Sequence, residues 1–181
     1  MYEGAIQRNP KLSSVALQGL RASCYLQDGG EATRRWLAQA RRSLPTGWHS
    51  HLAVGSLNAI AMLQIEGRCY GLTPSDVLEL ADLLERNPVY RRRDDRQGLS
   101  AVRSNLFLAN GDVGAAMAQM RKSLETLPDM DTIQALHRLI LATQGPQGAQ
   151  AFLQEVRGVL PPGGRLAREQ WQRGLDALEK P

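Results

Sequence analysis

Residues 111–128 read GDVGAAMAQMRKSLETLP, a glycine and an aspartate followed by a run that ends at a proline. The Gly-Asp pair is typical of a turn, and the apolar residues after it recur at helical spacing. Small Ala116 stands four residues before bulky Met120, and Pro128 follows eight residues after Met120. Because a proline and the residue before it rarely continue a helix, this stretch predicts one helix from Asp112 to Leu127.

The rest of the 181-residue chain favours helices in the same way. Leucine, alanine, glutamine and arginine are frequent, and these residues lose little side-chain freedom in a helix. Valine and isoleucine never alternate with polar residues over five or more positions, so we expect no strand. The other predicted helices are Tyr2–Asn9, Leu12–Gln27, Glu31–Leu44, Trp48–Cys69, Pro74–Arg86, Leu99–Ala109, Asp129–Thr143, Ala149–Leu160 and Arg165–Glu179.

One of these helices carries an explicit start signal. Thr73 precedes Pro74, and Asp76 follows Thr73 by three residues. A threonine can accept hydrogen bonds from the free N–H groups of the first turn, and proline fits the first helical position. Asp76 also suits the positive end of the helix dipole.

Prolines that end helices recur along the chain at a nearly regular interval. They are Pro10, Pro45, Pro88, Pro128 and Pro161, separated by 35, 43, 40 and 33 residues. Eight residues before each of the last four prolines stand Leu37, Leu80, Met120 and Leu153. Four residues earlier stand Thr33, Asp76, Ala116 and Ala149, of which two are alanine.

A period of about 34 residues for paired helices is the signature of tetratricopeptide repeats, and most of the chain resembles a degenerate form of that family. The resemblance implies an all-α, right-handed superhelical solenoid of four to five antiparallel helix pairs. Its single domain, 1–181, would contain a partial unit 1–10, units 11–45, 46–88, 89–128 and 129–161, and a capping helix 165–179. A non-repetitive bundle of the same helices is the alternative.

The resemblance also implies a binding surface. In such solenoids the first helix of each pair lines a concave face on which peptides lie. The repeat register assigns Gln18, Tyr25, Asn58, Arg68, Asn105, Gln134 and Arg138 to that face. We therefore expect a protein or peptide ligand, with a merely solvated groove as the alternative.

The net charge and the two cysteines limit the functions that the sequence favours. The net charge of +4 resides mainly in short arginine runs that no aromatic residues interrupt, a pattern that does not indicate nucleic-acid binding. Cys24 and Cys69 each lie in an apolar helical run, so we expect small buried side chains, and a disulfide between them stays open. No apolar run reaches the roughly 18 residues that a membrane-spanning helix needs.

The sequence contains no recognisable catalytic, metal-binding or cofactor-binding group. His49 and His51 are two residues apart and would point to different sides of a helix. His137 stands alone within a helix, which predicts packing at the edge of the core. Asp94 and Asp95 are flanked by arginines, which predicts local ion pairs.

We therefore expect a non-catalytic module for protein–protein interaction. The alternative is the soluble C-terminal accessory domain of a bacterial membrane-bound glycosyltransferase, polysaccharide polymerase or O-antigen ligase, whose catalysis would lie upstream. Met1 precedes what reads as the tail of a repeat, Tyr2–Ile6, which suggests an initiator added to a fragment. Such a fragment would be cytoplasmic or periplasmic. A free-standing helical enzyme is the third hypothesis.

Overall fold

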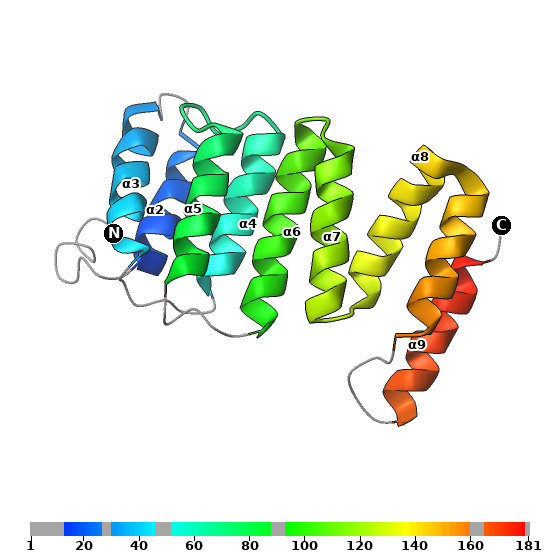
Figure 1. Ribbon diagram of the computed structural model, residues 1–181. Coiled ribbons are helices and arrows are strands. Elements are labelled where there is room, and N and C mark those ends of the chain that lie inside the picture. Colours follow the sequence, from blue (N-terminus) through cyan, green and yellow to red (C-terminus); the bar gives the residue numbers. More distant parts are fainter. Residues whose placement is uncertain (1–12, 27–29, 46–51, 88–92, 160–164, 180–181) are drawn as a thin grey trace. The chain divides into compact units, whose positions relative to one another are not determined.

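The computed structural model describes residues 13–26, 30–45, 52–87, 93–159 and 165–179 (Figure 1). Within these ranges the chain forms eight helices and no strand, which confirms the prediction of an all-α fold. The chain divides into two compact units, unit 1 (Met1–Asp112) and unit 2 (Val113–Pro181), which are described in turn. The predicted helix Tyr2–Asn9 lies outside the described residues.

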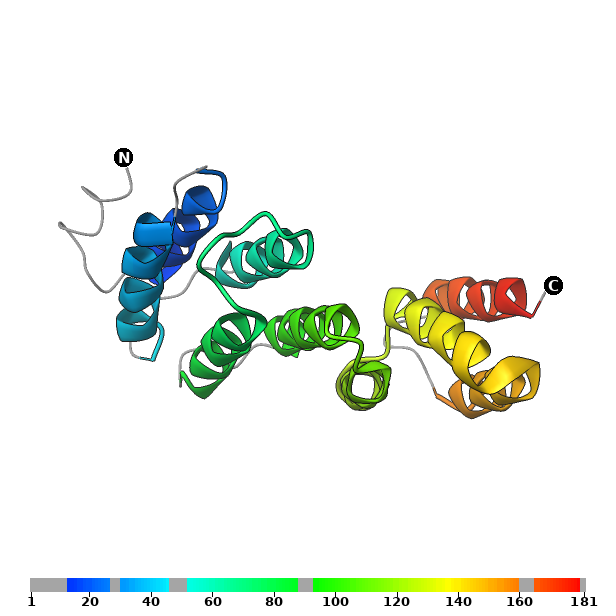
Figure 2. The same cartoon turned by 90° about the horizontal axis from the view of Figure 1, so that it is seen from above.

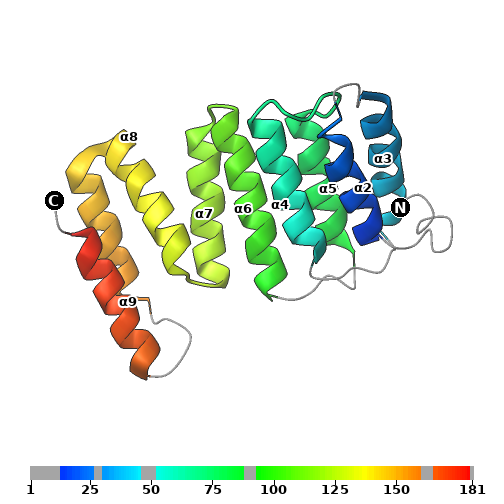
Figure 3. The ribbon, with the colours of Figure 1, turned by 180° about the vertical axis from the view of Figure 1, so that it is seen from behind.

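The described helices of unit 1 lie in two layers. They are α2 (Ser13–Ser23), α3 (Gly30–Ser43), α4 (Leu52–Ile65), α5 (Pro74–Arg86) and α6 (Arg93–Ala109). Helices α2, α4 and α6 pack side by side in one layer, and α3 packs against α5 in the other (Figures 2 and 3). Leucine and isoleucine side chains fill the space between the layers; Leu17, Leu20, Leu44, Leu57, Ile60, Leu80, Leu84, Leu99 and Leu106 are fully buried.

Two glycines allow the closest helix contacts in unit 1. A Cβ atom on Gly19 of α2 would lie 2.5 Å from ring carbons of Trp36 on α3. A Cβ atom on Gly98 of α6 would lie 2.5 Å from a methyl group of Val54 on α4. Because carbon atoms do not approach that closely, only glycine fits at these two positions without displacing its neighbour.

Helix α5 begins as its sequence predicts. The Thr73 hydroxyl accepts a hydrogen bond from the backbone N–H of Asp76, and the Asp76 carboxylate accepts one from the backbone N–H of Thr73. This reciprocal capping box satisfies two N–H groups that the helix itself leaves free, and Pro74 occupies the first turn.

Helix α4 ends four residues earlier than predicted, at Ile65 instead of Cys69. Gly67 adopts a positive φ of 67°, a conformation that glycine reaches without strain. The backbone N–H of Arg68 donates to the Leu63 carbonyl, and that of Gly67 donates to Gln64. This pattern is a Schellman cap, so the prediction of a continuous helix to Cys69 was wrong.

Two other boundaries in unit 1 also differ from the prediction. Helix α2 ends at Ser23, because the N–H groups of Tyr25 and Leu26 bond to carbonyls three residues back and tighten the chain into a turn. Helix α6 begins at Arg93, six residues before the predicted Leu99. The charged residues from Arg93 to Arg96 thus lie in the first turn of the helix.

Unit 2 contains α7 (Val113–Thr126), α8 (Met130–Arg157) and α9 (Arg165–Leu178). Helix α8 packs against both others, and it is broken at Gly145, whose φ of 77° is not helical. The break, followed by Pro146, confirms the predicted turn, and Figure 1 shows the two halves of α8 diverging from it. The buried side chains of unit 2 include Ala116, Ile133, Leu136, Ile140, Phe152, Leu153, Val156 and Leu175.

Candidate functional site

Cys24 and Cys69 form a disulfide, the state that the sequence left open. Cys24 directly follows α2 and Cys69 lies in the turn after α4, and the bond joins residues 45 apart in sequence. Both cysteines are buried, as predicted. A cross-link that closes a loop of this length stabilises a fold by about 4 kcal/mol through the entropy of the unfolded chain. The ends of α2 and α4 are therefore held together covalently.

Exposed side chains adjoin the two bonded cysteines in the sequence. Tyr25 follows Cys24 and Arg68 precedes Cys69, and the Arg68 guanidinium lies 5.5 Å from the centroid of the Tyr25 ring. Tyr25 and Leu26 are each 53% exposed and Tyr70 is 65% exposed. We call Tyr25, Leu26, Arg68 and Tyr70 the disulfide patch, because every member lies within two residues of a bonded cysteine. The structure thus brings together Tyr25 and Arg68, two of the residues that the repeat register selected.

The disulfide patch contains two residues that the sequence analysis missed. Leu26 and Tyr70 were not selected, because the repeat register did not assign them to the expected concave face. A signal for Tyr70 was present, since Gly67 and Gly71 flank it closely and favour a turn that exposes the residues between them. Tyrosine and arginine are enriched among the residues that dominate binding at protein interfaces.

The layer formed by α2, α4 and α6 carries three more of the selected residues. Gln18 on α2 and Asn58 on α4 are half-buried. Asn105 on α6 directs its Nδ2 towards the Sδ atom of exposed Met62 on α4, at 3.9 Å. The Oδ1 atom of Asn58 is buried and has no hydrogen-bond partner among the described residues. These polar groups therefore lie in the same layer as the disulfide patch.

The remaining two selected residues lie in unit 2. Gln134 is half-buried and Arg138 is exposed, and both belong to the first half of α8. Their spacing of four residues places them on one face of that helix. They form a separate feature from the layer of unit 1.

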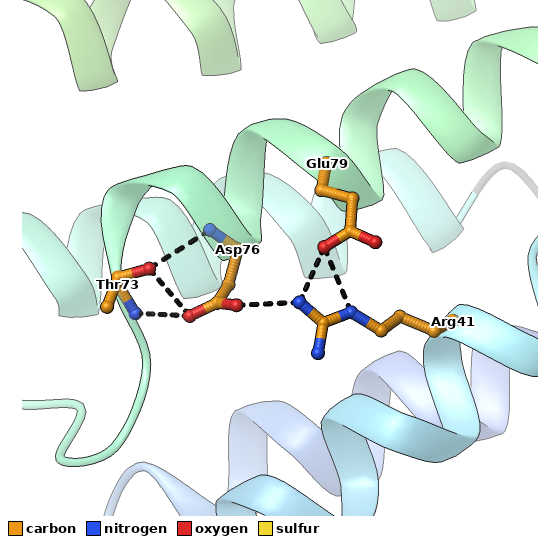
Figure 4. Close-up of polar contacts among 4 residues, drawn as sticks. All are labelled: Arg41, Thr73, Asp76 and Glu79. Atoms are coloured by element: carbon orange, nitrogen blue, oxygen red, sulfur yellow. Dashed lines mark hydrogen bonds and ion pairs between the residues drawn. The ribbon is translucent and has the colours of Figure 1, made fainter.

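In unit 1, an arginine side chain forms ion pairs that connect two neighbouring helices. Arg41 of α3 donates to Glu79 and Asp76 of α5, at 2.9 Å and 2.8 Å, and Asp76 also belongs to the Thr73 cap (Figure 4). Burial alone would raise the pKa of Asp76. Hydrogen bonds from Thr73 and the charge of Arg41 outweigh burial and lower the pKa below its ordinary value of 3.8. The hydrogen bond to Glu79 is the main reason that the pKa of Arg41 is raised.

Other arginines bridge neighbouring helices in the same way. Arg103 of α6 donates to Asp82 and Glu85 of α5, at 2.7 Å and 2.6 Å. Burial lowers the pKa of Arg103, but these two carboxylates outweigh burial and raise it. In unit 2, Arg157 of α8 contacts Asp176 and Glu179 near the end of α9. Each of these carboxylates thus forms an ion pair with an arginine of a neighbouring helix.

Of the three histidines and the pair Asp94 and Asp95, the structure describes the side chain of His137 alone. His137 is buried in unit 2, as predicted. His49 and His51 lie outside the described residues, as do the side chains of Asp94 and Asp95. Among the described residues no group of three histidine, cysteine, aspartate or glutamate side chains is arranged to hold a metal ion.

Comparison with protein-family models, with curated proteins and with solved structures finds no match for this chain. The structure adds that no helix in the described ranges combines the length and apolar character needed to cross a lipid bilayer. The candidate site is therefore defined by its geometry alone.

Proposed function

We propose that unit 1 is a protein-interaction module that binds a peptide segment on the layer formed by α2, α4 and α6. One observation carries this proposal, the grouping of exposed Tyr25, Leu26 and Tyr70 with Arg68 around a single disulfide. Large apolar side chains that remain exposed favour a partner, because their burial against it removes apolar surface from water. Met62 and Asn105 extend the surface along the same layer.

The proposal includes the fold that the sequence resembles. We propose a tetratricopeptide-like solenoid of antiparallel helix pairs in a right-handed superhelix, with α9 as its capping helix. Support comes from unit 1, where α2, α4 and α6 pack in one layer and α3 packs on α5 in the other. Alternate helices of a solenoid of helix pairs pack in this way.

The chain itself is proposed to be non-catalytic. Support comes from Asp76, Asp82 and Glu85, whose carboxylates are bound by arginines of neighbouring helices. Turnover of any substrate by the purified chain would refute this part of the proposal.

Selection from a phage-displayed library of random peptides on the immobilised, oxidised chain tests the binding function. We expect enriched peptides whose binding is lost with Arg68→Ala and weakened with Asn105→Ala. Arg34→Ala is the matched control, since Arg34 is exposed on α3 in the opposite layer. Equal loss with all three variants, or the absence of any enriched peptide, would refute the assignment of this surface.

A second candidate function is favoured by the disulfide. Disulfides persist in oxidising compartments such as the bacterial periplasm, where the soluble end of a membrane-bound polysaccharide polymerase, O-antigen ligase or protein glycosyltransferase could lie. In that case the described residues are an accessory domain that binds a partner of the enzyme. The test is to sequence the gene upstream of the codon for Tyr2. Membrane-spanning segments there support this function, and a reading frame that begins at Met1 refutes it.

A further inference from the structure

We infer that the Cys24–Cys69 disulfide assembles the disulfide patch, so that unit 1 binds its peptide only when the chain is oxidised. The inference rests on the proposed function. It adds that peptide binding depends on the redox state of the two cysteines and takes place in an oxidising compartment. The first observation is that Tyr25 directly follows Cys24 and Arg68 directly precedes Cys69 in the sequence. Their side chains meet in the contact between ring and guanidinium that spans the two turns.

The contacts within each turn do not hold the two turns together. The turn after α2 is formed by hydrogen bonds from Tyr25 and Leu26 to carbonyls of α2. The turn after α4 is formed by the bonds of Gly67 and Arg68 to carbonyls of α4. Each set is internal to one helix end. The disulfide is the covalent link between these two ends.

The Tyr25–Arg68 contact is too weak to replace that link. A cation–π contact between exposed side chains contributes little, because water competes for the cation. Arg68 also contacts Glu66 at 3.4 Å, and both side chains are about half exposed. An exposed ion pair of this kind adds almost nothing to stability. The packing of α2 against α4 keeps the two helix ends near each other without the bond, but it does not fix the exposed side chains, so we expect Tyr25 and Arg68 to lose their defined contact when the disulfide is absent.

The chemistry of the patch indicates the kind of peptide it binds. Tyr25, Leu26 and Tyr70 offer apolar surface, and the Arg68 guanidinium offers planar hydrogen-bond donors that suit a carboxylate. Since Glu66 holds Arg68 only weakly, a carboxylate from a partner can displace it. The expected ligand is a segment with an aromatic or aliphatic side chain next to an aspartate or glutamate.

Formation of the bond is ordinary thiol–disulfide exchange. A disulfide oxidant, either a small molecule or a protein, accepts two electrons and two protons from the thiols of Cys24 and Cys69. The S–S bond of the oxidant breaks as the Cys24–Cys69 bond forms, and the oxidant leaves as two thiols. Both cysteines are buried in the folded chain, so a reductant reaches the bond only after local opening. The oxidised, binding-competent chain is therefore expected in an oxidising compartment.

The test compares the oxidised full chain with Cys24→Ala/Cys69→Ala, which keeps small apolar side chains at both buried positions. The first measurement needs no ligand. Nuclear Overhauser contacts between the Tyr25 ring and the Arg68 side chain should be present in the oxidised chain and absent in the double variant. Unchanged helical circular dichroism shows that the double variant is folded. Contacts that persist in the folded double variant overturn the inference.

The second measurement uses the tightest peptide from the library selection. Its dissociation constant should rise at least about tenfold in the double variant, the loss expected when a dominant interface contact is removed. If the double variant fails to fold, Tyr25→Leu and Arg68→Gln in the disulfide-bonded chain serve instead, and wild-type affinity in both overturns the inference. Equal affinity of the oxidised chain and the double variant overturns it while leaving the proposed function intact. If no peptide is selected, the proposed function fails and the nuclear Overhauser comparison alone decides.

Discussion

The substitution Gly19→Ala should give unit 1 no gain in stability, although alanine is a much better helix former than glycine. Gly19 lies inside α2, where alanine gains about 1 kcal/mol over glycine from helix propensity alone. The ring of Trp36 opposes that gain, because its three nearest carbon atoms would lie 2.5–2.6 Å from the new Cβ atom. The sign of the net effect therefore depends on whether the ring can move.

The required movement follows from the geometry. Ordinary van der Waals contact begins at 3.4 Å, so the ring must retreat by roughly 0.9 Å, the difference between 3.4 and 2.5. Trp36 is buried, and its fused rings move as a rigid body between α2 and the core. Overpacking of this kind costs about 1–3 kcal/mol. We expect this cost to cancel the helix-propensity gain or to exceed it by up to about 2 kcal/mol.

Gly55→Ala provides the matched control. Gly55 lies in α4, and no neighbouring atom comes within 4 Å of the position that a Cβ atom would take there, so alanine should stabilise the chain by about 1 kcal/mol. Urea unfolding followed by circular dichroism and tryptophan fluorescence should place Gly19→Ala about 1–3 kcal/mol below Gly55→Ala. In a Trp36→Leu background the difference should largely disappear. Equal stabilisation by the two alanines would show that the α2–α3 crossing is less close than described.

Three further predictions concern other parts of the chain. Because the pKa of Asp76 is lowered, its carboxylate stabilises the folded chain at pH values above its ordinary pKa of 3.8. This stabilisation is lost as the pH falls through the lower pKa of the folded state. Asp76→Asn should therefore lower the free energy of unfolding in urea at neutral pH, and the variant should lose less of that free energy on acidification than the unsubstituted chain. Ala116→Leu, at a fully buried position, should cost about 1–3 kcal/mol in denaturant unfolding, whereas Ala118→Leu at an exposed position of α7 should be nearly neutral. Removal of α9 (Arg165–Leu178) should expose the α8 surface that buries Leu175, and light scattering should then detect self-association.

Local signals in the sequence were enough for some helix boundaries. The start of α5 could be predicted because a threonine, a proline and an aspartate at the right spacing satisfy the first N–H groups without help from distant residues. The break of α8 could be predicted for a similar reason, since Gly145 and Pro146 act on their own backbone. The end of α4 was predicted wrongly because Gly67 was treated as one more helical residue, although glycine often ends helices.

These local signals do not predict contacts between segments that are far apart in the sequence. Cys24 and Cys69 are 45 residues apart, and their pairing depends on α2 and α4 packing side by side with their ends together. The bond from Arg41 to Asp76 likewise depends on α3 packing against α5. Residue spacing along one helix carries no information about such pairs. The candidate site was therefore predictable as a set of separate residues and not as a patch.

Arg68 differs from the arginines that bridge helices, and this difference supports its role in binding. Arg41 and Arg103 each contact two carboxylates of a neighbouring helix, so their charges already have partners that fix helix packing. Arg68 instead contacts a ring, at 5.5 Å, and one carboxylate two residues away in the same turn. Neither contact joins two helices along their length, and both leave the guanidinium accessible to solvent. The exposed Arg68 guanidinium therefore has the solvent access that the peptide ligand proposed above requires.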